Sequence, residues 1–277
     1  MRVAFQGERG AFSEEAARQL VGAAAEMVPS QRFEDVFNRL RDGAVDAAVV
    51  PIENTLHGSV HENYDHLLHY DFPITAETSL RIVHNLIAAP GVTLAQVKRV
   101  YSHPVALNQC LQFFLDHPEF EKLSHYDTAG SVKTVMESGL RDAAGIASAV
   151  AAEIYGAQIL QRSIEDDRAN FTRFFLLRRQ GKASPVPPPA DGVWKTSLVF
   201  TTRNQPAALF RALSAFALRD LDLTKIESRP LRGKPWEYLF YLDFVATEGS
   251  VPAQNAIRHL AEYADLLKVF GCYPRGC

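Results

Sequence analysis

One stretch of the sequence decides how the chain folds: Asn170-Phe171-Thr172-Arg173-Phe174-Phe175-Leu176-Leu177. Its aromatic and aliphatic residues predict a buried β-strand. Burying a hydroxyl or a guanidinium without partners costs several kcal/mol, so we expect Thr172 and Arg173 where the strand begins, facing a polar cleft. A polar pair held on a rigid apolar strand suits a catalytic site. A strand edge with a solvated arginine fits the same residues.

The first 180 residues alternate strand-like runs with amphipathic stretches. The strand-like runs are Val3–Gln6, Ala47–Pro51, Val97–Ser102, Leu123–Tyr126 and Gly145–Ser148. The helical stretches are Ser13–Ala25, Phe33–Arg41, Val60–His69, Pro104–His117 and Ala129–Ser138. This alternation predicts an α/β fold with mainly parallel strands. We expect Glu77–Ala89 to carry the chain into a second lobe, about residues 78–160, and Thr172–Leu177 to return it, with a cleft between the two lobes.

A proline-rich segment divides the chain. Residues 181–194 include Pro185-Val186-Pro187-Pro188-Pro189, and proline at that density joins neither a helix nor a central strand. The segment predicts a stiff linker between a body of residues 1–180 and a module of residues 195–277. The module reads as strand, helix, strand, strand, helix, strand, which is the ferredoxin-like order βαββαβ.

The composition excludes several classes of protein. The 277 residues are 47% hydrophobic and 22% charged with a net charge of −3, as is typical of globular proteins. The sequence lacks a basic stripe of the kind that predicts nucleic-acid binding. It also lacks a long uncharged apolar run of the kind that predicts a membrane span. The chain opens on a strand-like run without an export signal, and its three cysteines lack ligand spacing. We therefore expect a cytoplasmic protein.

Hydroxyl residues stand at four predicted strand-to-helix junctions: Ser13, Thr55, Ser102 and Thr128. Each suits a helix N-cap, a purely structural role. However, helix N-termini gather at the carboxyl ends of the strands in an open α/β sheet, and they attract anions. Four helix N-termini directed at one cleft would favour binding of a small carboxylate. The spacing of the glycines does not fit a nucleotide, so no nucleotide cofactor is expected.

Two further groups of side chains bear on the chemistry. Glu53 and Asn54 directly follow an apolar run, where a carboxylate serves either in acid–base chemistry or as an ordinary loop residue. His57, His61, His66 and His69 have spacings that suit a metal, but most of them fall on the expected solvated face of a helix. We therefore expect no metal site.

Five motifs occur in an order that is informative as a set: Phe5-Gln6-Gly7 with Gly10-Ala11-Phe12-Ser13; Val50-Pro51-Ile52-Glu53-Asn54-Thr55 with Gly58-Ser59-Val60; Ser102-His103-Pro104 with Ala106-Leu107 and Gln109; Asp127-Thr128-Ala129; and Asn170-Phe171-Thr172-Arg173-Phe174. With them the chain resembles the prephenate dehydratases, which make phenylpyruvate in phenylalanine biosynthesis. The tail is similar to their regulatory ACT domain, with the signature Leu223-Thr224-Lys225-Ile226-Glu227-Ser228-Arg229-Pro230.

The resemblance implies a hydro-lyase with a two-lobed, periplasmic-binding-protein-like catalytic domain that needs neither cofactor nor metal. It implies catalytic roles for Thr172, Glu53 and Arg173. It also implies substrate binding by Ser13, Asn54, Thr55, Ser102, His103, Thr128 and Phe174. In the reaction, Thr172 donates a hydrogen bond to the leaving hydroxyl, and a neutral Glu53 or a water completes the proton transfer. Arg173 either holds the side-chain carboxylate of the substrate or fixes its strand through an ion pair.

The resemblance also implies phenylalanine as an effector that shifts the population of two conformations. Its expected site, between two subunits of a homodimer or dimer of dimers, comprises Ala207, Ala208, Leu209, Glu227, Ser228 and Arg229. Ala207 stands where the family usually has glycine, so its methyl group is expected to crowd the ligand, and a dimerisation module without a ligand remains an alternative. Two other functions stay open. An arogenate dehydratase performs the same chemistry on the aminated substrate, and a non-enzymatic small-carboxylate binding protein uses a similar cleft but predicts an export signal.

Overall fold

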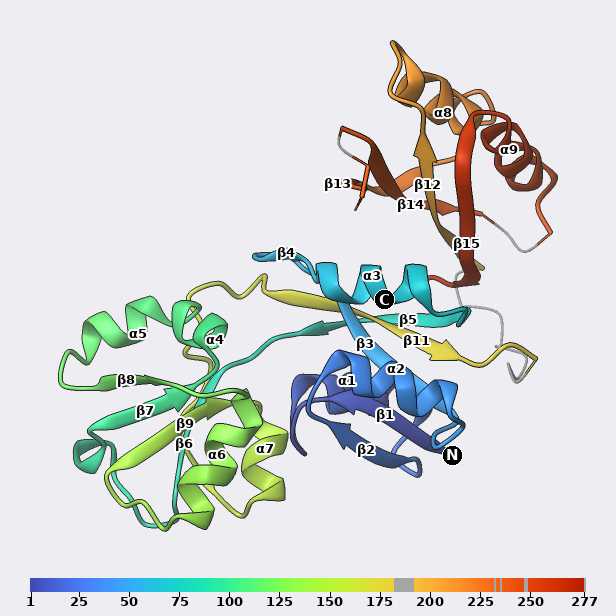
Figure 1. Ribbon diagram of the computed structural model, residues 1–277. Helices are drawn as coiled ribbons and strands as arrows, with labels where there is room; N and C mark the ends of the chain where they lie inside the picture. Colours follow the sequence, from blue (N-terminus) through green and yellow to red (C-terminus); the bar gives the residue numbers. More distant parts are fainter. Residues whose placement is uncertain (182–191, 232, 235, 247–248, 277) are drawn as a thin grey trace. The chain divides into compact units, whose positions relative to one another are not determined.

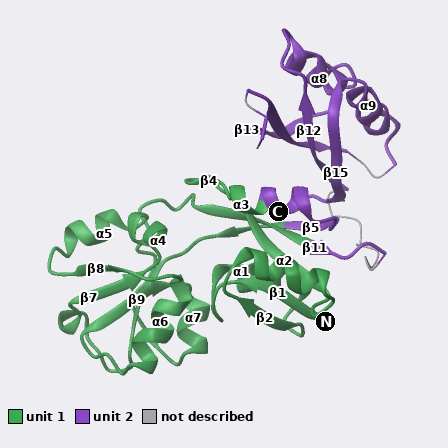
Figure 2. Ribbon diagram, in the orientation of Figure 1, with its two compact units in different colours: residues 1–63, 78–176 green, residues 64–77, 177–277 purple. Residues whose placement is uncertain are grey.

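The computed structural model describes residues 1–181, 192–231, 233–234, 236–246 and 249–276 (Figure 1). Most of the expected linker, residues 181–194, thus lies outside the described residues. The described chain divides into two compact units, residues 1–63 with 78–176, and residues 64–77 with 177–277 (Figure 2). No helix of the described segments is long and apolar enough to cross a membrane.

The first sheet has the strand order β2-β1-β3-β11-β5, with the short β4 paired to β3. Strand β1 runs parallel to both β2 and β3, and the first four residues of β3 are fully buried. Such apolar runs are typical of parallel strands covered on both faces. The elements of this lobe are β1 (Arg2–Gln6), α1 (Phe12–Val21), β2 (Glu26–Ser30), α2 (Phe33–Arg41), β3 (Ala47–Asn54), β4 (Gly58–Ser59), α3 (His61–His69), β5 (Ile74–Arg81) and β11 (Phe171–Arg178).

The second sheet has the order β10-β6-β9-β7-β8. Strand β7 is parallel to β8 and β9, whereas β6 is antiparallel to β9 and β10. The elements are β6 (Asn85–Ala88), a 3₁₀ turn (Leu94–Gln96), β7 (Arg99–Ser102), α4 (Pro104–Asn108), α5 (Leu111–Asp116), β8 (Glu121–Ser124), α6 (Thr128–Glu137), β9 (Ala143–Ala147), α7 (Ala149–Ile154) and β10 (Gln158–Gln161). The predicted pair of α/β lobes is confirmed.

The third sheet is antiparallel, in the order β13-β14-β12-β15. Its elements are β12 (Trp194–Thr202), α8 (Ala208–Ala217), β13 (Leu223–Pro230), β14 (Tyr238–Val245), α9 (Val251–Ala261) and β15 (Ala264–Pro274). This sequence of elements confirms the predicted order βαββαβ. Side chains from both helices, among them Phe216 and Leu260, form one core with Phe200 and Phe244 of the sheet.

A part of the chain assigned by sequence to the catalytic body, residues 64–77, belongs to the second unit instead. The ring of Tyr64 lies 4.5 Å from that of Tyr241 in β14. The ammonium group of Lys268 in β15 donates to three carbonyl oxygens at the end of α3, those of Leu67, Leu68 and Tyr70. A lysine placed there satisfies carbonyl groups that the helix itself leaves unpaired. These contacts explain why residues 64–77 belong to the second unit, and no pattern in the sequence predicts them.

Candidate active site

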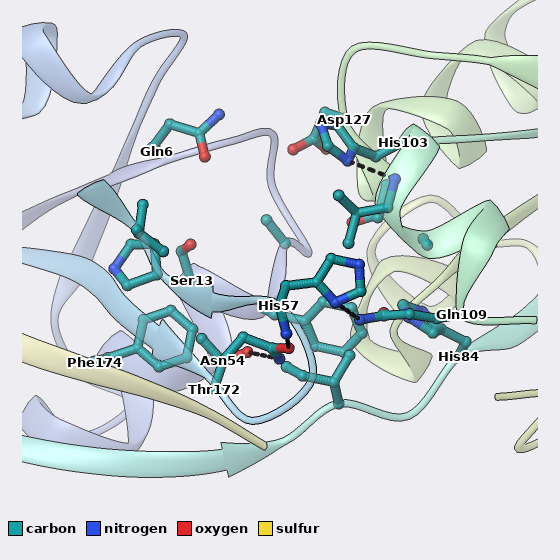
Figure 3. Close-up of a pocket in the computed structure, with 18 of the residues that line it drawn as sticks. Gln6, Ser13, Asn54, His57, His84, His103, Gln109, Asp127, Thr172 and Phe174 are labelled. Atoms are coloured by element: carbon teal, nitrogen blue, oxygen red, sulfur yellow. Dashed lines mark hydrogen bonds between the residues drawn. The ribbon is translucent and has the colours of Figure 1, made fainter. Parts of the chain in front are cut away.

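The first unit contains a pocket of about 430 Å³, a volume in the range of small-molecule sites (Figure 3). Strands β1, β3 and β11 of the first sheet contribute to its lining, and so do the segments after β7 and β8 of the second sheet. Of the residues that the sequence predicted for the site, the lining includes Ser13, Asn54, His103, Thr128, Thr172 and Phe174. The pocket therefore gathers residues from segments far apart in the sequence.

Thr172 is held in the pocket by the side chain of Asn54. Asn54 Nδ2 donates to Thr172 Oγ1 at 2.9 Å, and it also lies within hydrogen-bond distance of Asn170 Oδ1 and the carbonyl oxygen of Phe171. An amide nitrogen only donates, so Thr172 Oγ1 is the acceptor. The hydroxyl hydrogen of Thr172 is not used in this contact and is left for a group in the pocket.

The other end of the Asn54 amide fixes the turn after β3. Its Oδ1 accepts from the backbone N–H groups of Leu56 and His57, each at 3.0 Å. A hydrogen-bonded side chain of this kind stabilises a turn in the way of a backbone turn. Asn54 thus positions Thr172 on one strand and the segment that carries His57 on another, in addition to lining the pocket.

Glu53 and Arg173 do not line the pocket, although the sequence predicted catalytic roles for both. Successive side chains of a strand point to opposite faces, and Asn54 and Thr172 already face the pocket. Arg173 Nη1 lies 3.6 Å from Glu53 Oε2, and the guanidinium stands 4.8 Å from the centre of the Phe175 ring. This geometry favours the alternative in which Arg173 fixes its strand through an ion pair.

Two predicted substrate-binding hydroxyls, those of Thr55 and Ser102, also lie outside the lining. Thr55 Oγ1 donates to the carbonyl oxygen of Ala169 at 2.8 Å and accepts from the N–H of Phe171 at 3.0 Å. Ser102 Oγ is buried and donates to the carbonyl oxygen of Ile146 at 2.7 Å. Both hydroxyls satisfy backbone groups of other segments, but neither is the helix N-cap that the sequence allowed, because Thr55 lies in the turn before β4 and His103, not Ser102, caps α4.

On the side of the second lobe, the pocket is lined by two capping residues. His103 Nδ1 accepts from the N–H of Val105 at the start of α4, and Asp127 Oδ1 accepts from the N–H of Gly130 at the start of α6. Burial lowers the pKa of His103 and raises the pKa of Asp127. Gly7 packs against this carboxylate with a φ of +117°, and a Cβ there would lie 2.8 Å from Asp127 Oδ2, so only glycine fits.

The pocket is poor in charge. Its described lining residues include neither lysine nor arginine, and their only carboxylate is that of Asp127. Within the described segments, no three His, Cys, Asp or Glu side chains lie together in a way that suits a metal ion.

Among the lining residues that reasoning from sequence did not assign to the site are Gln6, His57, His84, Gln109 and Asp127. Gln6, Gln109 and Asp127 belong to the quoted motifs, so the motifs contained them without assigning a role. His57 was considered only as a metal ligand. His84 is 2% exposed and looks like part of an apolar run, so only the fold brings its ring to the pocket.

Comparisons with known proteins agree with this geometry. The family model described as prephenate dehydratase matches residues 3–182. An Arabidopsis thaliana protein, arogenate dehydratase/prephenate dehydratase 2, chloroplastic, is 44% identical over 99% of this chain and 73% of its own length. The chain belongs to the prephenate dehydratase family. It is therefore a dehydratase, a carbon–oxygen lyase, as the resemblance implied.

Solved structures of the prephenate dehydratase family share the fold. Prephenate dehydratase from Arthrobacter aurescens, in complex with L-Phe, is 31% identical with a TM-score of 0.89, over 99% of this chain and 90% of that one. GqqA, described as a novel type of quorum quenching acylase, is 33% identical with the same TM-score, over 99% of this chain and 98% of that one. Similarity thus extends through the tail as well as the catalytic body.

The expectation of a cytoplasmic location is contradicted. The Arabidopsis relatives named as arogenate dehydratase/prephenate dehydratase are described as chloroplastic. The expectation rested on composition and on cysteines without ligand spacing. Neither feature distinguishes the cytoplasm from another compartment in which cysteines stay reduced.

Proposed function

We propose that this pocket converts prephenate to phenylpyruvate with loss of carbon dioxide and water. The observation that carries the proposal is the hydroxyl of Thr172, whose oxygen accepts from Asn54 and whose hydrogen is left for the pocket. Through that hydrogen Thr172 donates a hydrogen bond to the 4-hydroxyl of the substrate as it leaves, and a water supplies the proton that converts the departing hydroxide to water. Formation of the aromatic ring supplies the driving force, so the site needs only to position the substrate and to polarise the leaving group.

The charge of the lining supports this assignment. The ring carboxylate of prephenate loses its negative charge as carbon dioxide forms. Cations that bound this carboxylate tightly would stabilise the ground state more than the transition state and would slow the reaction. A pocket whose described lining has amide, hydroxyl and imidazole groups but neither lysine nor arginine avoids that penalty.

Turnover of prephenate by two variants of Thr172 tests the proposal. Thr172→Val keeps the shape of the side chain and removes the donor, so we expect kcat to fall by about 10²- to 10³-fold, as for other lost transition-state donors. Thr172→Ser keeps the hydroxyl and should retain kcat within about tenfold. An unchanged kcat in the valine variant, with the fold intact by circular dichroism, would refute the role of Thr172.

Arogenate is the second candidate substrate. The Arabidopsis relatives carry both substrates in their names, and the Asp127 carboxylate offers this pocket an anionic partner for the ammonium group of arogenate. Comparison of kcat/KM for the two substrates decides between them. If arogenate is used through Asp127, Asp127→Asn lowers kcat/KM for arogenate and spares that for prephenate. Equal losses on both substrates would assign Asp127 a purely structural role.

Phenylalanine is the proposed effector of the tail, whose βαββαβ order and signature residues 223–230 resemble those of the ACT domain. Ala207 directly precedes α8 with φ +64°, and Ala208 and Leu209 line a pocket of about 150 Å³ in the second unit. The other predicted effector residues, Ala207, Glu227, Ser228 and Arg229, are not in that lining. Arg229 Nη1 lies 2.6 Å from Asp65 Oδ1 in the same unit.

Because the predicted effector residues fall into two separate groups, we propose that they meet across two subunits of a homodimer or dimer of dimers. Assays with increasing phenylalanine, alongside sedimentation velocity, test this arrangement. If phenylalanine changes neither the activity nor the sedimentation coefficient, the arrangement is refuted.

A further inference from the structure

We propose that His57 donates a hydrogen bond from its Nε2–H to a carboxylate group of the bound substrate, and that Gln109 and His84 hold its ring in the donating form. The identity of the ligand rests on the proposed function. No motif that identified the family includes His57, which entered the sequence reasoning only as a metal ligand. The inference therefore adds a substrate-binding residue to this site.

The segment that carries His57 is fixed, while its ring is accessible. The backbone N–H of His57 donates to Asn54 Oδ1 at 3.0 Å, and Asn54 pairs with Gly58 where β3 meets β4. The residue itself is exposed and lines the pocket. A rigid backbone with an accessible polar ring is what a binding contact requires.

A chain of hydrogen bonds determines which nitrogen of His57 carries the hydrogen. Gln109 Nε2 lies 3.3 Å from His57 Nδ1. The amide nitrogen is a donor, so Nδ1 must accept, and the hydrogen of the neutral ring is then on Nε2. Gln109 is oriented in turn by His84, whose Nε2 lies 2.8 Å from Gln109 Oε1. That oxygen is an acceptor, so His84 Nε2 carries a hydrogen.

His84 is suited to anchor this chain. It is 2% exposed, its backbone N–H donates to Glu165 Oε2 at 3.0 Å, and the Phe12 ring stands edge-on to it at 5.6 Å. Burial lowers the pKa of His84, so its ring is neutral at pH 7. Its Nδ1 has no hydrogen-bond partner among the described residues, which fits a nitrogen without a hydrogen better than an unpaired buried N–H.

The direction of the ring indicates the group that it contacts. In Figure 3 the His57 ring extends into the pocket away from Thr172 and towards the side where His103 lies. In prephenate, the ring carbon that bears both carboxylate-containing substituents is opposite the carbon that bears the leaving hydroxyl. With that hydroxyl at Thr172, the carboxylates extend towards the His57 side. A neutral donor also suits a carboxylate that loses its charge during the reaction.

Two substitutions separate the two nitrogens of His57. His57→Asn keeps an acceptor for Gln109 near the position of Nδ1 but removes the donor into the pocket. We expect it to raise KM for prephenate about tenfold or more while kcat stays within about threefold, the loss expected for a hydrogen bond to a charged group. His57→Gln places an amide N–H near the position of Nε2 and should restore KM to within about threefold of wild type.

Product binding identifies which carboxylate is held. Phenylpyruvate retains the side-chain carboxylate and lacks the ring carboxylate. If His57 holds the side-chain group, His57→Asn weakens phenylpyruvate binding, measured by isothermal titration calorimetry, by the same factor as it raises KM. If His57 holds the ring carboxylate, phenylpyruvate binds His57→Asn and wild type alike.

Gln109 is a positioning residue in this scheme. Gln109→Leu should raise KM as His57→Asn does, and the double variant should be no worse than either single variant, because both act on one contact. His69→Asn, at an exposed histidine of α3 outside the pocket, is the matched control. A KM in His57→Asn within about twofold of the control overturns the inference. So does a His57→Gln variant as impaired as His57→Asn.

Wild-type protein that binds phenylpyruvate but does not turn over prephenate would refute the proposed function instead. The role of His57 would then be decided on binding of prephenate itself, which carries both carboxylates. In that case, equal affinity of wild type and His57→Asn for prephenate in isothermal titration calorimetry overturns it.

Discussion

Replacing Asn54 by aspartate should disable the catalytic hydroxyl without removing it. The two side chains have the same shape, but aspartate has an oxygen where Asn54 has its donor nitrogen. In the native protein that nitrogen makes contacts of 2.7, 3.1 and 2.9 Å with Asn170 Oδ1, the carbonyl oxygen of Phe171 and Thr172 Oγ1. In Asn54→Asp two of the three groups are able to reverse: the Asn170 amide turns its Nδ2, which has no hydrogen-bond partner among the described residues, towards the new carboxylate, and the Thr172 hydroxyl becomes a donor to it.

The size of both effects follows from these contacts. One acceptor, the carbonyl oxygen of Phe171, is left facing a carboxylate in a half-buried place, which lowers the free energy of unfolding by about 1–2 kcal/mol. The hydroxyl hydrogen of Thr172 is no longer available to the substrate, so kcat falls by about 10²- to 10³-fold. Aspartate retains the two acceptor contacts to Leu56 and His57, so the turn after β3 is expected to persist.

The assay compares kcat for Asn54→Asp, Thr172→Val and the double variant. Both single variants remove the same hydrogen bond to the substrate, so kcat of the double variant should equal that of Thr172→Val within about threefold. Protonation of the introduced carboxyl group makes it a donor again. Activity of Asn54→Asp relative to wild type should therefore rise as the pH is lowered.

Two results would contradict this reasoning. One is a kcat in Asn54→Asp close to that of wild type in a folded protein. The other is a double variant in which the two losses multiply, since independent contributions would mean that Asn54 does not act through Thr172.

Three further predictions concern stability. The folded-state pKa of His84 is below its unfolded value, so the unfolded chain binds a proton first as the pH falls. The free energy of unfolding should therefore drop between about pH 7 and pH 5. Urea titrations at both pH values should show a smaller drop for His84→Asn than for wild type. Lys268→Met removes three hydrogen bonds to the end of α3 and should lower the free energy of unfolding by about 1–3 kcal/mol in urea; an unchanged value would mean that solvent replaces those bonds at no cost. Ala207 has a left-handed conformation, which costs a non-glycine residue about 1–2 kcal/mol. Ala207→Gly removes this cost and adds a smaller one, about 0.5–1 kcal/mol of backbone entropy, so the melting temperature should rise. A lower melting temperature would show that the alanine is not strained.

The same backbone angle explains a feature that sequence reasoning interpreted differently. Ala207 was expected to crowd the effector with its methyl group, because the family usually has glycine there. The structure shows a φ of +64° at this position, directly before α8. Glycine suits such a conformation because it has no Cβ. The substitution therefore bears on the backbone at the start of the helix as well as on space for a ligand.

Sequence alone determined many of the elements and the candidate motifs, but it did not predict β2, α7 or β10. Alternation of apolar runs with amphipathic stretches predicted the two α/β lobes, and the tail was correctly predicted as βαββαβ because both patterns are local. The motifs also located the pocket, since five of them contribute lining residues such as Gln6, Asn54, His103, Asp127 and Thr172.

Only the tertiary structure decided which side chain of each motif faces the pocket. Thr172 and Arg173 are neighbours in one motif, as are Asn54 and Glu53, and the sheet sends one of each pair into the pocket and the other away from it. The chain from His57 through Gln109 to His84 joins three segments that no local pattern relates. Residue spacing reports the period of a strand, but the direction of its faces is set by what packs against them, and that is a property of the folded chain.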